Sequence, residues 1–198
     1  MAMAQPQEQQ PMRMSEAEYL EFEETSETRH EFVDGEVYAM AGAGINHNII
    51  NGNVQTTLNT QVNDDCIVVS SDMRLKVASK KVSYRYPDTM VICGDIELVE
   101  NRTDTITNPI IVVEVLSPST ALKDFNEKKD EYLKIHSIQD YVIISQHEAK
   151  IEVYSRLSSS KWSFRQVEGM DASIELPSIA CMLDLPIIYA KTKNLKTD

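Results

Sequence analysis

The chain has 198 residues, of which 42% are hydrophobic and 25% charged, a composition typical of one globular domain that excludes a disordered protein. The net charge of −12 argues against a general nucleic-acid binder, because phosphate contacts need Lys and Arg. No apolar run approaches the roughly 20 residues of a membrane helix, and the polar N-terminus has no apolar segment of a signal peptide, so we expect a cytoplasmic protein.

The N-terminal part of the chain begins with residues 1–13, which are rich in Gln and Pro and are predicted to be a disordered tail. A single domain is predicted over residues 14–192. Ser15 and Glu18 have the spacing of a capping box, which predicts a short helix after Ser15. The dipeptide Asp34-Gly35 is a strong turn signal, so "RHEFVDGEVYAM" is predicted to form a β-hairpin.

A long helix is predicted over residues 44–62, where apolar residues recur mostly every fourth position. These residues are Ile45, Ile49, Ile50, Val54, Leu58 and Val62, and the other face carries Asn, Gln and Thr. Strands are predicted for "CIVVS" from residue 66, "MRLKV" from 73, "VSYRY" from 82, "TMVIC" from 89 and "IIVVEVL" from 110.

A third helix is predicted over residues 117–136, with "SPST" as its start, because Ser and Thr are good caps and Pro is favoured in the first turn. Strands are predicted for "DYVIIS" from residue 140, "KIEVYSR" from 150 and "KWSFRQV" from 161, before the closing segment "LPSIACMLDLPIIY". This order predicts an α/β or α+β fold, with a mixed central sheet flanked by helices.

The three cysteines, Cys66, Cys93 and Cys181, are far apart and have no C-x-x-C spacing. They predict neither a disulfide framework nor a zinc site. Each is expected to act as a small buried hydrophobe.

Charge is distributed unevenly along the chain. Residues 14–36 carry nine acidic residues and one basic residue. Residues 71–86 carry one acidic residue and five basic ones, which we call the basic island: Arg74, Lys76, Lys80, Lys81 and Arg85. The basic island is a candidate contact surface for an anionic polymer such as DNA. The alternative is an exposed hairpin whose lysines keep its edge soluble.

Glu114 is the one acidic residue in the aliphatic run "IIVVEVL". Such a run is typical of a central strand covered on both faces, where an unpaired charge is costly. The carboxylate is either satisfied by an Arg or by backbone donors, or it belongs to a functional site, where buried ionisable groups are concentrated.

Asp88 precedes the apolar strand "TMVIC", and taken alone it is best interpreted as a turn aspartate after Pro87. Asp124, Lys128 and Tyr132 are spaced four apart, so they share one face of the helix predicted over residues 117–136. The alternative is that this face is an ordinary solvated stripe. Two converging carboxylates, Asp88 and Glu114, would repel each other unless a cation such as Mg²⁺ or Mn²⁺ lies between them.

Two further residues are weaker candidates for this site. Glu31 precedes Phe32 in the first hairpin and is otherwise one more surface acid of an acidic segment. His47 lies early on the long helix, where a capping or packing role competes with a catalytic one.

At these residues the chain resembles the Uma-two family of restriction-endonuclease-like proteins, within the PD-(D/E)XK nuclease superfamily. The resemblance rests on "YPD" at 86–88, "VVEVLSPST" at 112–120, "D-x-x-x-K-x-x-x-Y" at 124–132 and "DYVIIS" at 140–145, with the weaker N-terminal "HEFVDGEVYAMAGAGINHNII". It implies a restriction-endonuclease-like core, a divalent metal and hydrolysis of phosphodiester bonds.

The resemblance also implies roles for individual residues. Asp88 matches the Asp of the PD motif and Glu114 the acidic residue of (D/E)XK, both metal ligands, and Glu31 matches an early Glu that completes the acidic site. The chain departs from the superfamily where Leu116 stands in place of the Lys. Lys128, on the following helix, matches the displaced Lys, and its neighbour Lys129 points about 100° away around the helix.

We therefore expect a Mg²⁺- or Mn²⁺-dependent endonuclease acting on DNA, with the basic island holding the phosphate backbone. The alternatives are a non-catalytic binding or regulatory module that keeps the nuclease core, and a metal-dependent hydrolase of smaller phosphate esters. Because one domain of this size cuts one strand, we expect a homodimer.

Overall fold

The computed structural model describes residues 11–78, 81–116 and 123–195, whose strands form two six-stranded sheets. The first sheet has the order β1-β3-β2-β6-β5-β8. Its strands are β1 (Met12–Arg13), β2 (His30–Val33), β3 (Glu36–Ala39), β5 (Arg74–Ala78), β6 (Val82–Arg85) and β8 (Thr105–Ile106). Helix α1 (Glu16–Thr25) packs against this sheet through Tyr19, which stacks on Phe32.

The second sheet has the order β12-β11-β10-β9-β7-β4 and is mixed, because β9 and β10 are parallel and the other pairs antiparallel. Its strands are β4 (Cys66–Ser70), β7 (Thr89–Cys93), β9 (Ile111–Leu116), β10 (Asp140–Ser145), β11 (Lys150–Ser158) and β12 (Lys161–Glu168). Helices flank this mixed sheet, which confirms the predicted fold class.

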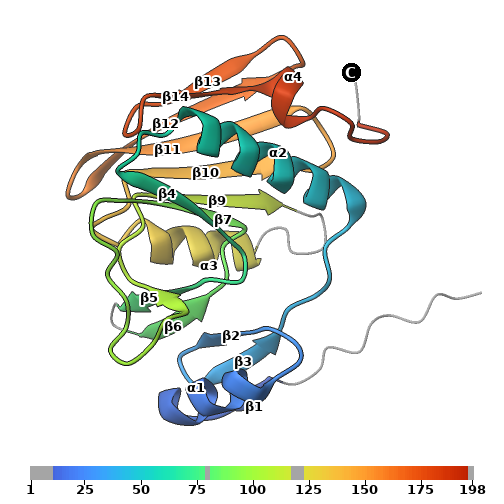
Figure 1. The fold of residues 1–198 in the computed structure, drawn as a ribbon. Helices are drawn as coiled ribbons and strands as arrows, with labels where there is room; N and C mark the ends of the chain where they lie inside the picture. Colours follow the sequence, from blue (N-terminus) through green and yellow to red (C-terminus); the bar gives the residue numbers. More distant parts are fainter. Residues whose placement is uncertain (1–10, 79–80, 117–122, 196–198) are drawn as a thin grey trace, which may run out of the picture.

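Two layers cover the second sheet (Figure 1). Helix α2 (Ile45–Gln61), the hairpin of β13 (Ser173–Leu176) and β14 (Cys181–Asp184), and the short α4 (Leu185–Ile188) lie on one face. Helix α3 (Lys123–Tyr132) lies on the other face, between the two sheets. Side chains on this second face therefore point toward the side of the sheet where α3 lies.

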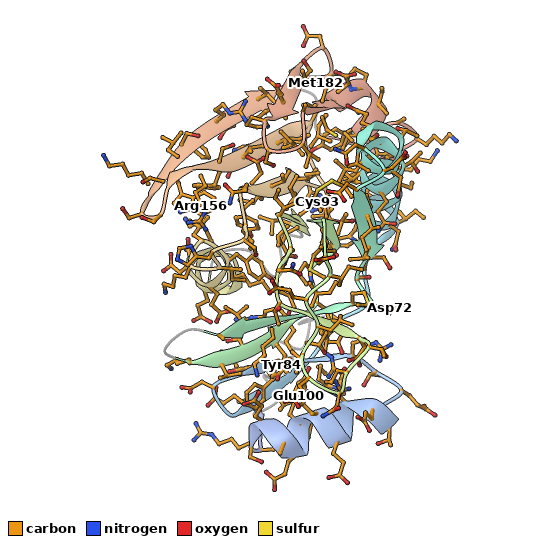
Figure 2. All side chains as sticks on the ribbon, turned by 60° about the vertical axis from the view of Figure 1, so that its left-hand side comes forward. Asp72, Tyr84, Cys93, Glu100, Arg156 and Met182 are labelled. Atoms are coloured by element: carbon orange, nitrogen blue, oxygen red, sulfur yellow. A yellow bond between two sulfur atoms is a disulfide. The ribbon has the colours of Figure 1, made fainter. Side chains whose placement is uncertain are left out.

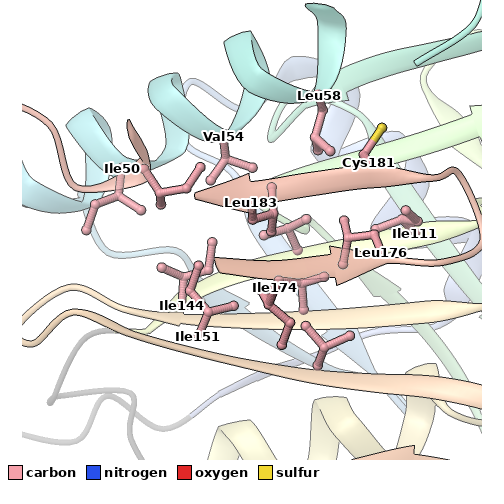
Figure 3. Close-up of a cluster of buried hydrophobic side chains, with 14 of the residues drawn as sticks. Ile50, Val54, Leu58, Ile111, Ile144, Ile151, Ile174, Leu176, Cys181 and Leu183 are labelled. Carbon is pink, nitrogen blue, oxygen red and sulfur yellow. The ribbon is translucent and has the colours of Figure 1, made fainter. Parts of the chain in front are cut away.

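The predicted long helix is confirmed, and its apolar face forms the main core. Ile50, Val54 and Leu58 are fully buried against the second sheet and the β13–β14 hairpin (Figure 3). Ile45, at the first position of α2, is instead 68% exposed. The four-residue spacing thus located the helix correctly, although its first member lies outside the core.

Strand β9 separates two cores by alternation of its side chains. Val113 and Val115 pack in the core that contains α2, whereas Val112 packs in the core that contains Tyr132 of α3. Glu114 lies on the Val112 face. The lone acidic residue of the strand is therefore directed toward α3.

The chain passes directly from the first sheet to the second between Arg85 and Thr89. Figure 2 shows Tyr84, on β6, among the side chains of the first sheet and Cys93, at the end of β7, in the second. Pro87 lies in this crossing, where the loss of a backbone donor disturbs no ladder. Asp88 is consequently placed at the junction of the two sheets.

Two boundaries differ from the predictions. Met12 and Arg13 form strand β1, which pairs with β3, so order begins inside the predicted tail; residues 1–10 lie outside the described part. Helix α3 ends at Tyr132 and is followed by turns. The "SPST" segment, predicted as its start, also lies outside the described residues.

The structure corrects the cysteine prediction, because Cys66 and Cys93 form a disulfide. They are directly opposite each other on the antiparallel strands β4 and β7, with their Cα atoms 4.0 Å apart. Strand register brings them together across 27 residues of sequence, which no spacing rule detects. Cys181 is free and buried, as expected.

Helices of the described residues include none with the length and apolar character needed to span a membrane.

Candidate active site

Asp88 and Glu114 meet at the junction of the two sheets. Strands β7 and β9 are antiparallel with Thr89 opposite Val113, so the next pair along the ladder is Asp88 and Glu114. The backbone N–H of Val115 donates a hydrogen bond to Asp88 Oδ2 at 2.7 Å. The residues matched to the two metal ligands thus lie side by side.

Helix α3 brings Lys128 and Tyr132 to the same place. Lys128 Nζ lies 2.9 Å from Glu31 Oε1 and 3.8 Å from Glu114 Oε1. The Tyr132 hydroxyl donates a hydrogen bond to Glu114 Oε1 at 2.9 Å. Lys128 of α3 therefore lies near the carboxylate of Glu114, although the strand position of the superfamily's Lys is occupied by Leu116. The side chain of Asp124 lies outside the described residues.

Glu31 enters the site from the first sheet, opposite Arg85. Arg85 Nη1 donates to Glu31 Oε2 at 2.8 Å, and the same guanidinium binds both carboxylate oxygens of Glu131 on α3, at 2.9 and 3.1 Å. Arg85 is only 3% exposed. Its hydrogen bonds therefore link the first sheet to α3 and hold Glu31 close to Lys128.

His47 approaches Asp88 from the first turn of α2. Its Nε2 lies 3.1 Å from Asp88 Oδ2. Burial alone would lower the pKa of His47, but the hydrogen bond and charge of Asp88, together with the charge of Glu114, raise it above its ordinary value.

Burial sets the electrostatics of the two glutamates. Glu114 is 7% exposed, and burial, reinforced by the charges of Asp88 and Glu31 and opposed by Lys128 and Tyr132, raises its pKa to about 8. Burial would also raise the pKa of Glu31, but Lys128 and Arg85 outweigh it, so the pKa of Glu31 is below its ordinary value. Burial likewise raises the pKa of Tyr132, which keeps its hydroxyl protonated as a donor.

The Uma-two family model, named Uma2 and described as "Putative restriction endonuclease", matches residues 16–187. The chain belongs to the Uma2 family. The expected membership is thereby confirmed over nearly the whole described chain.

Relatives and a solved structure agree with this placement. The chain is 36% identical to "Uncharacterized protein sll1609" of Synechocystis sp. over 82% of its length and 92% of that protein. It is 32% identical to "Uncharacterized protein slr1290" of the same organism over 89% and 92%. A structure from Anabaena variabilis, titled "a putative nuclease belonging to DUF820", superposes with a TM-score of 0.68, covering 83% of this chain and 92% of that one. At 19% identity this likeness shows a shared fold.

The donor set of this Uma2 site suits a hard cation at two of its three carboxylates. Asp88 Oδ1 and Glu114 Oε2 accept no hydrogen bond from another described residue, and carboxylate oxygens are the ligands that Mg²⁺ prefers. Glu31 differs, because its two oxygens face Arg85 and Lys128. The described residues contain no group of three or more His, Cys, Asp or Glu that could hold a metal ion. Asp88 and Glu114 are the two carboxylates of this site with an oxygen available to a metal. Glu31 instead holds the ammonium group of Lys128.

Two of the five members of the basic island, Arg74 and Arg85, are buried and do not lie on the phosphate-contact surface that the sequence suggested. Arg74 is 1% exposed and pairs with Asp104, and Arg85 is buried as described above. Lys76 pairs with Glu16, and Lys81 with Asp34. Lys80 lies outside the described residues. The acidic segment 14–36 supplies Glu16, Glu31 and Asp34, so three of its nine acidic residues pair with bases of the island.

Sequence reasoning missed Glu131 and the hydrogen bonds by which Arg85 links it to Glu31. The available signal was spacing, because Glu131 lies three residues after Lys128 on the same helix and such residues are neighbours on its surface. Arg85 was counted as a surface base, although a position between Tyr84 and Tyr86 in an apolar hairpin indicates burial as readily.

Proposed function

We propose that this Uma2 protein is a Mg²⁺- or Mn²⁺-dependent endonuclease that hydrolyses phosphodiester bonds of DNA. The observation that carries the proposal is the convergence of Asp88, Glu114 and Lys128 at one buried junction, in a chain of this family. The fold explains the convergence, because each residue comes from an element that the junction brings together.

Asp88 and Glu114 would hold the metal through the oxygens that their protein partners leave available. When bound there, the metal supplies a water of lowered pKa and neutralises charge on the phosphate. Tyr132 and the Val115 N–H each hold one oxygen of a ligand carboxylate, which fixes the orientation of that carboxylate. Such preorganisation lowers the cost of reaching the reactive geometry.

Lys128 is the residue that would act on the reacting phosphate or its attacking water. Its ammonium is held at the site by Glu31, 2.9 Å away, and Arg85 in turn holds Glu31. A fixed positive charge in a partly dehydrated site stabilises negative charge that develops on phosphate oxygens. Glu31 is thus a positioning residue for Lys128 in this scheme.

The test is cleavage of supercoiled, linear and single-stranded DNA with Mg²⁺, Mn²⁺ or chelator. Asp88→Ala, Glu114→Ala and Lys128→Ala should each lower the cleavage rate at least about a hundredfold and retain the circular dichroism spectrum of the wild type. Glu175→Ala and Lys161→Ala remove exposed side chains of the same types and serve as matched controls. Full activity of Glu114→Ala would sink the proposal.

The burial of Arg74 and Arg85 favours testing a smaller substrate in parallel, because it removes two cations from the expected DNA surface. Hydrolysis of bis(p-nitrophenyl) phosphate without cleavage of any DNA would indicate a phosphodiesterase for small esters. Mn²⁺ binding without either activity would indicate a binding module. For cleavage of both DNA strands we further propose a homodimer, which sedimentation of the wild type would show.

A further inference from the structure

Three polar residues of α2, which we call the polar stripe, follow a spacing of four: His47, Asn51 and Gln55. Residues with this spacing lie one above the other on a helix face. The stripe runs beside the apolar residues Ile50 and Val54, which are fully buried against the sheet. It therefore faces the edge of the core, where β7 begins.

Each member of the polar stripe contacts Asp88 or the next residue, Thr89. His47 Nε2 lies 3.1 Å from Asp88 Oδ2, and Asn51 Nδ2 donates to the backbone oxygen of Asp88 at 3.2 Å. The Thr89 hydroxyl donates to Asn51 Oδ1 at 2.7 Å and accepts from Gln55 Nε2 at 3.2 Å. Four contacts thus hold two consecutive residues by side chain and main chain.

The contacts are sheltered from water. Thr89 is fully buried, and the side chain of Asp88 is 13% exposed. The other ring nitrogen of His47, Nδ1, is buried and has no hydrogen-bond partner among the described residues. The contact with Asp88 is therefore the one hydrogen bond in the described part of the chain that orients this imidazole.

We propose that the polar stripe is a positioning device for Asp88, with His47 as its principal residue. His47 and the Val115 N–H both occupy Asp88 Oδ2, while Asn51 and Thr89 fix the backbone, so Oδ1 is left as the oxygen for a cation. The inference rests on the proposed function, because it assigns Asp88 to metal binding. Outer partners of ligand side chains typically contribute 10- to 100-fold to metal affinity.

The experiment is calorimetric titration of Mn²⁺ into wild type, His47→Ala, His47→Gln and, as a matched control, His136→Ala, which removes an exposed histidine. His47→Ala should bind Mn²⁺ about tenfold more weakly. His47→Gln should bind within about threefold of wild type, because a glutamine amide nitrogen can donate to Asp88 Oδ2 in place of Nε2. Thermal unfolding of the metal-free variants checks that each is folded.

Cleavage at saturating Mn²⁺ separates positioning from direct chemistry. A positioning role predicts that His47→Gln retains most of the wild-type rate. Equal loss in His47→Gln and His47→Ala, with Mn²⁺ affinity retained in both, would overturn the proposal in favour of His47 acting on substrate. Wild-type affinity in His47→Ala would also overturn it.

Asp88→Ala distinguishes failure of the inference from failure of the proposed function. If wild type binds Mn²⁺ and Asp88→Ala does not, Asp88 belongs to a metal site. The His47 variants then test only the positioning role of the polar stripe. If wild type and Asp88→Ala both fail to bind Mn²⁺, the proposed function fails and the positioning role fails with it.

Discussion

Two of the regions that contain buried charged side chains are balanced differently. In the first sheet, Asp104 accepts from two guanidiniums, those of Arg74 and Arg102. Although burial opposes it, these partners hold the pKa of Asp104 well below its ordinary value. At the junction of the sheets, Glu114 has one lysine at 3.8 Å and shares it with Glu31, and its pKa rises to about 8.

The difference indicates which region is complete without a ligand. The carboxylate of Asp104 is neutralised by two guanidiniums of the chain, those of Arg74 and Arg102, as in a structural ion pair. At the junction, Glu31 is paired with both Arg85 and Lys128, whereas Glu114 has only a share of Lys128 at 3.8 Å. An added cation beside Glu114 and Asp88 would therefore be favourable. A raised carboxylate pKa in such a place is typical of functional sites.

Neutralising one carboxylate in each region should give the largest contrast. Asp104→Asn should lower the free energy of unfolding by about 1 to 2 kcal/mol, because it leaves the buried Arg74 guanidinium without its counter-charge. The effect is smaller than for a fully buried pair, because the Asp104 side chain is 44% exposed. Glu114→Gln should leave that free energy unchanged or raise it, because it removes a carboxylate that its surroundings disfavour. Urea denaturation of the metal-free proteins measures both.

Asp95→Asn, at an exposed position, is the control for this pair and should have little effect on stability. Equal destabilisation by Asp104→Asn and Glu114→Gln would erase the distinction between the two regions.

Removing the shared lysine should sharpen the contrast. Lys128→Met keeps the aliphatic length but removes the charge near Glu31 and Glu114, so Mn²⁺ should bind about tenfold more tightly while cleavage is lost. Calorimetry measures the affinity, with Lys161→Met as the exposed control. Weaker Mn²⁺ binding in Lys128→Met would mean that the lysine supports the metal site instead of competing with the metal.

The last expected effect is on the pH dependence of stability. Glu114 has a folded-state pKa of about 8 against an ordinary 4.5, so between these values the folded state binds more protons and stability should fall as pH rises. Asp104, with its pKa lowered from 3.8, should act oppositely, its contribution being lost as pH falls into the acid range.

Urea denaturation at pH 5 to 8 in chelator, for wild type and Glu114→Gln, isolates the first contribution. The Glu114→Gln protein should lose less stability than wild type across this range. Parallel curves would show that Glu114 is ionised throughout.

Local patterns predicted much of this molecule. The capping box of Ser15 and Glu18 is present, the Asp34-Gly35 turn has both residues at positive φ, and β9 is the buried strand that its aliphatic run indicated. These features depend on neighbours in sequence, which is why they can be read from it. The family resemblance then selected Asp88, Glu114, Lys128 and Glu31, and the structure brings all four together.

What the sequence did not reveal depends on register between distant strands. Cys66 and Cys93 lie opposite each other in the β4–β7 ladder, and Glu31 and Arg85 are the next residues beyond the Phe32–Tyr84 pair of the β2–β6 ladder. The same limit explains the basic island, because charge counts along a segment do not show that Arg74 turns inward to Asp104. The polar stripe of α2 was visible as composition, but its target, Asp88, was not.

The crossing at residues 86–88 also has a consequence for folding kinetics. The residues of the candidate site come from six elements: β2, β6, the start of β7, β9, α2 and α3. Nearly all contacts between them therefore join residues that are distant in sequence. Contacts of this kind form late, because long loops must close first. A growing or partly folded chain therefore lacks the site, and any nuclease activity would arise only when both sheets have joined.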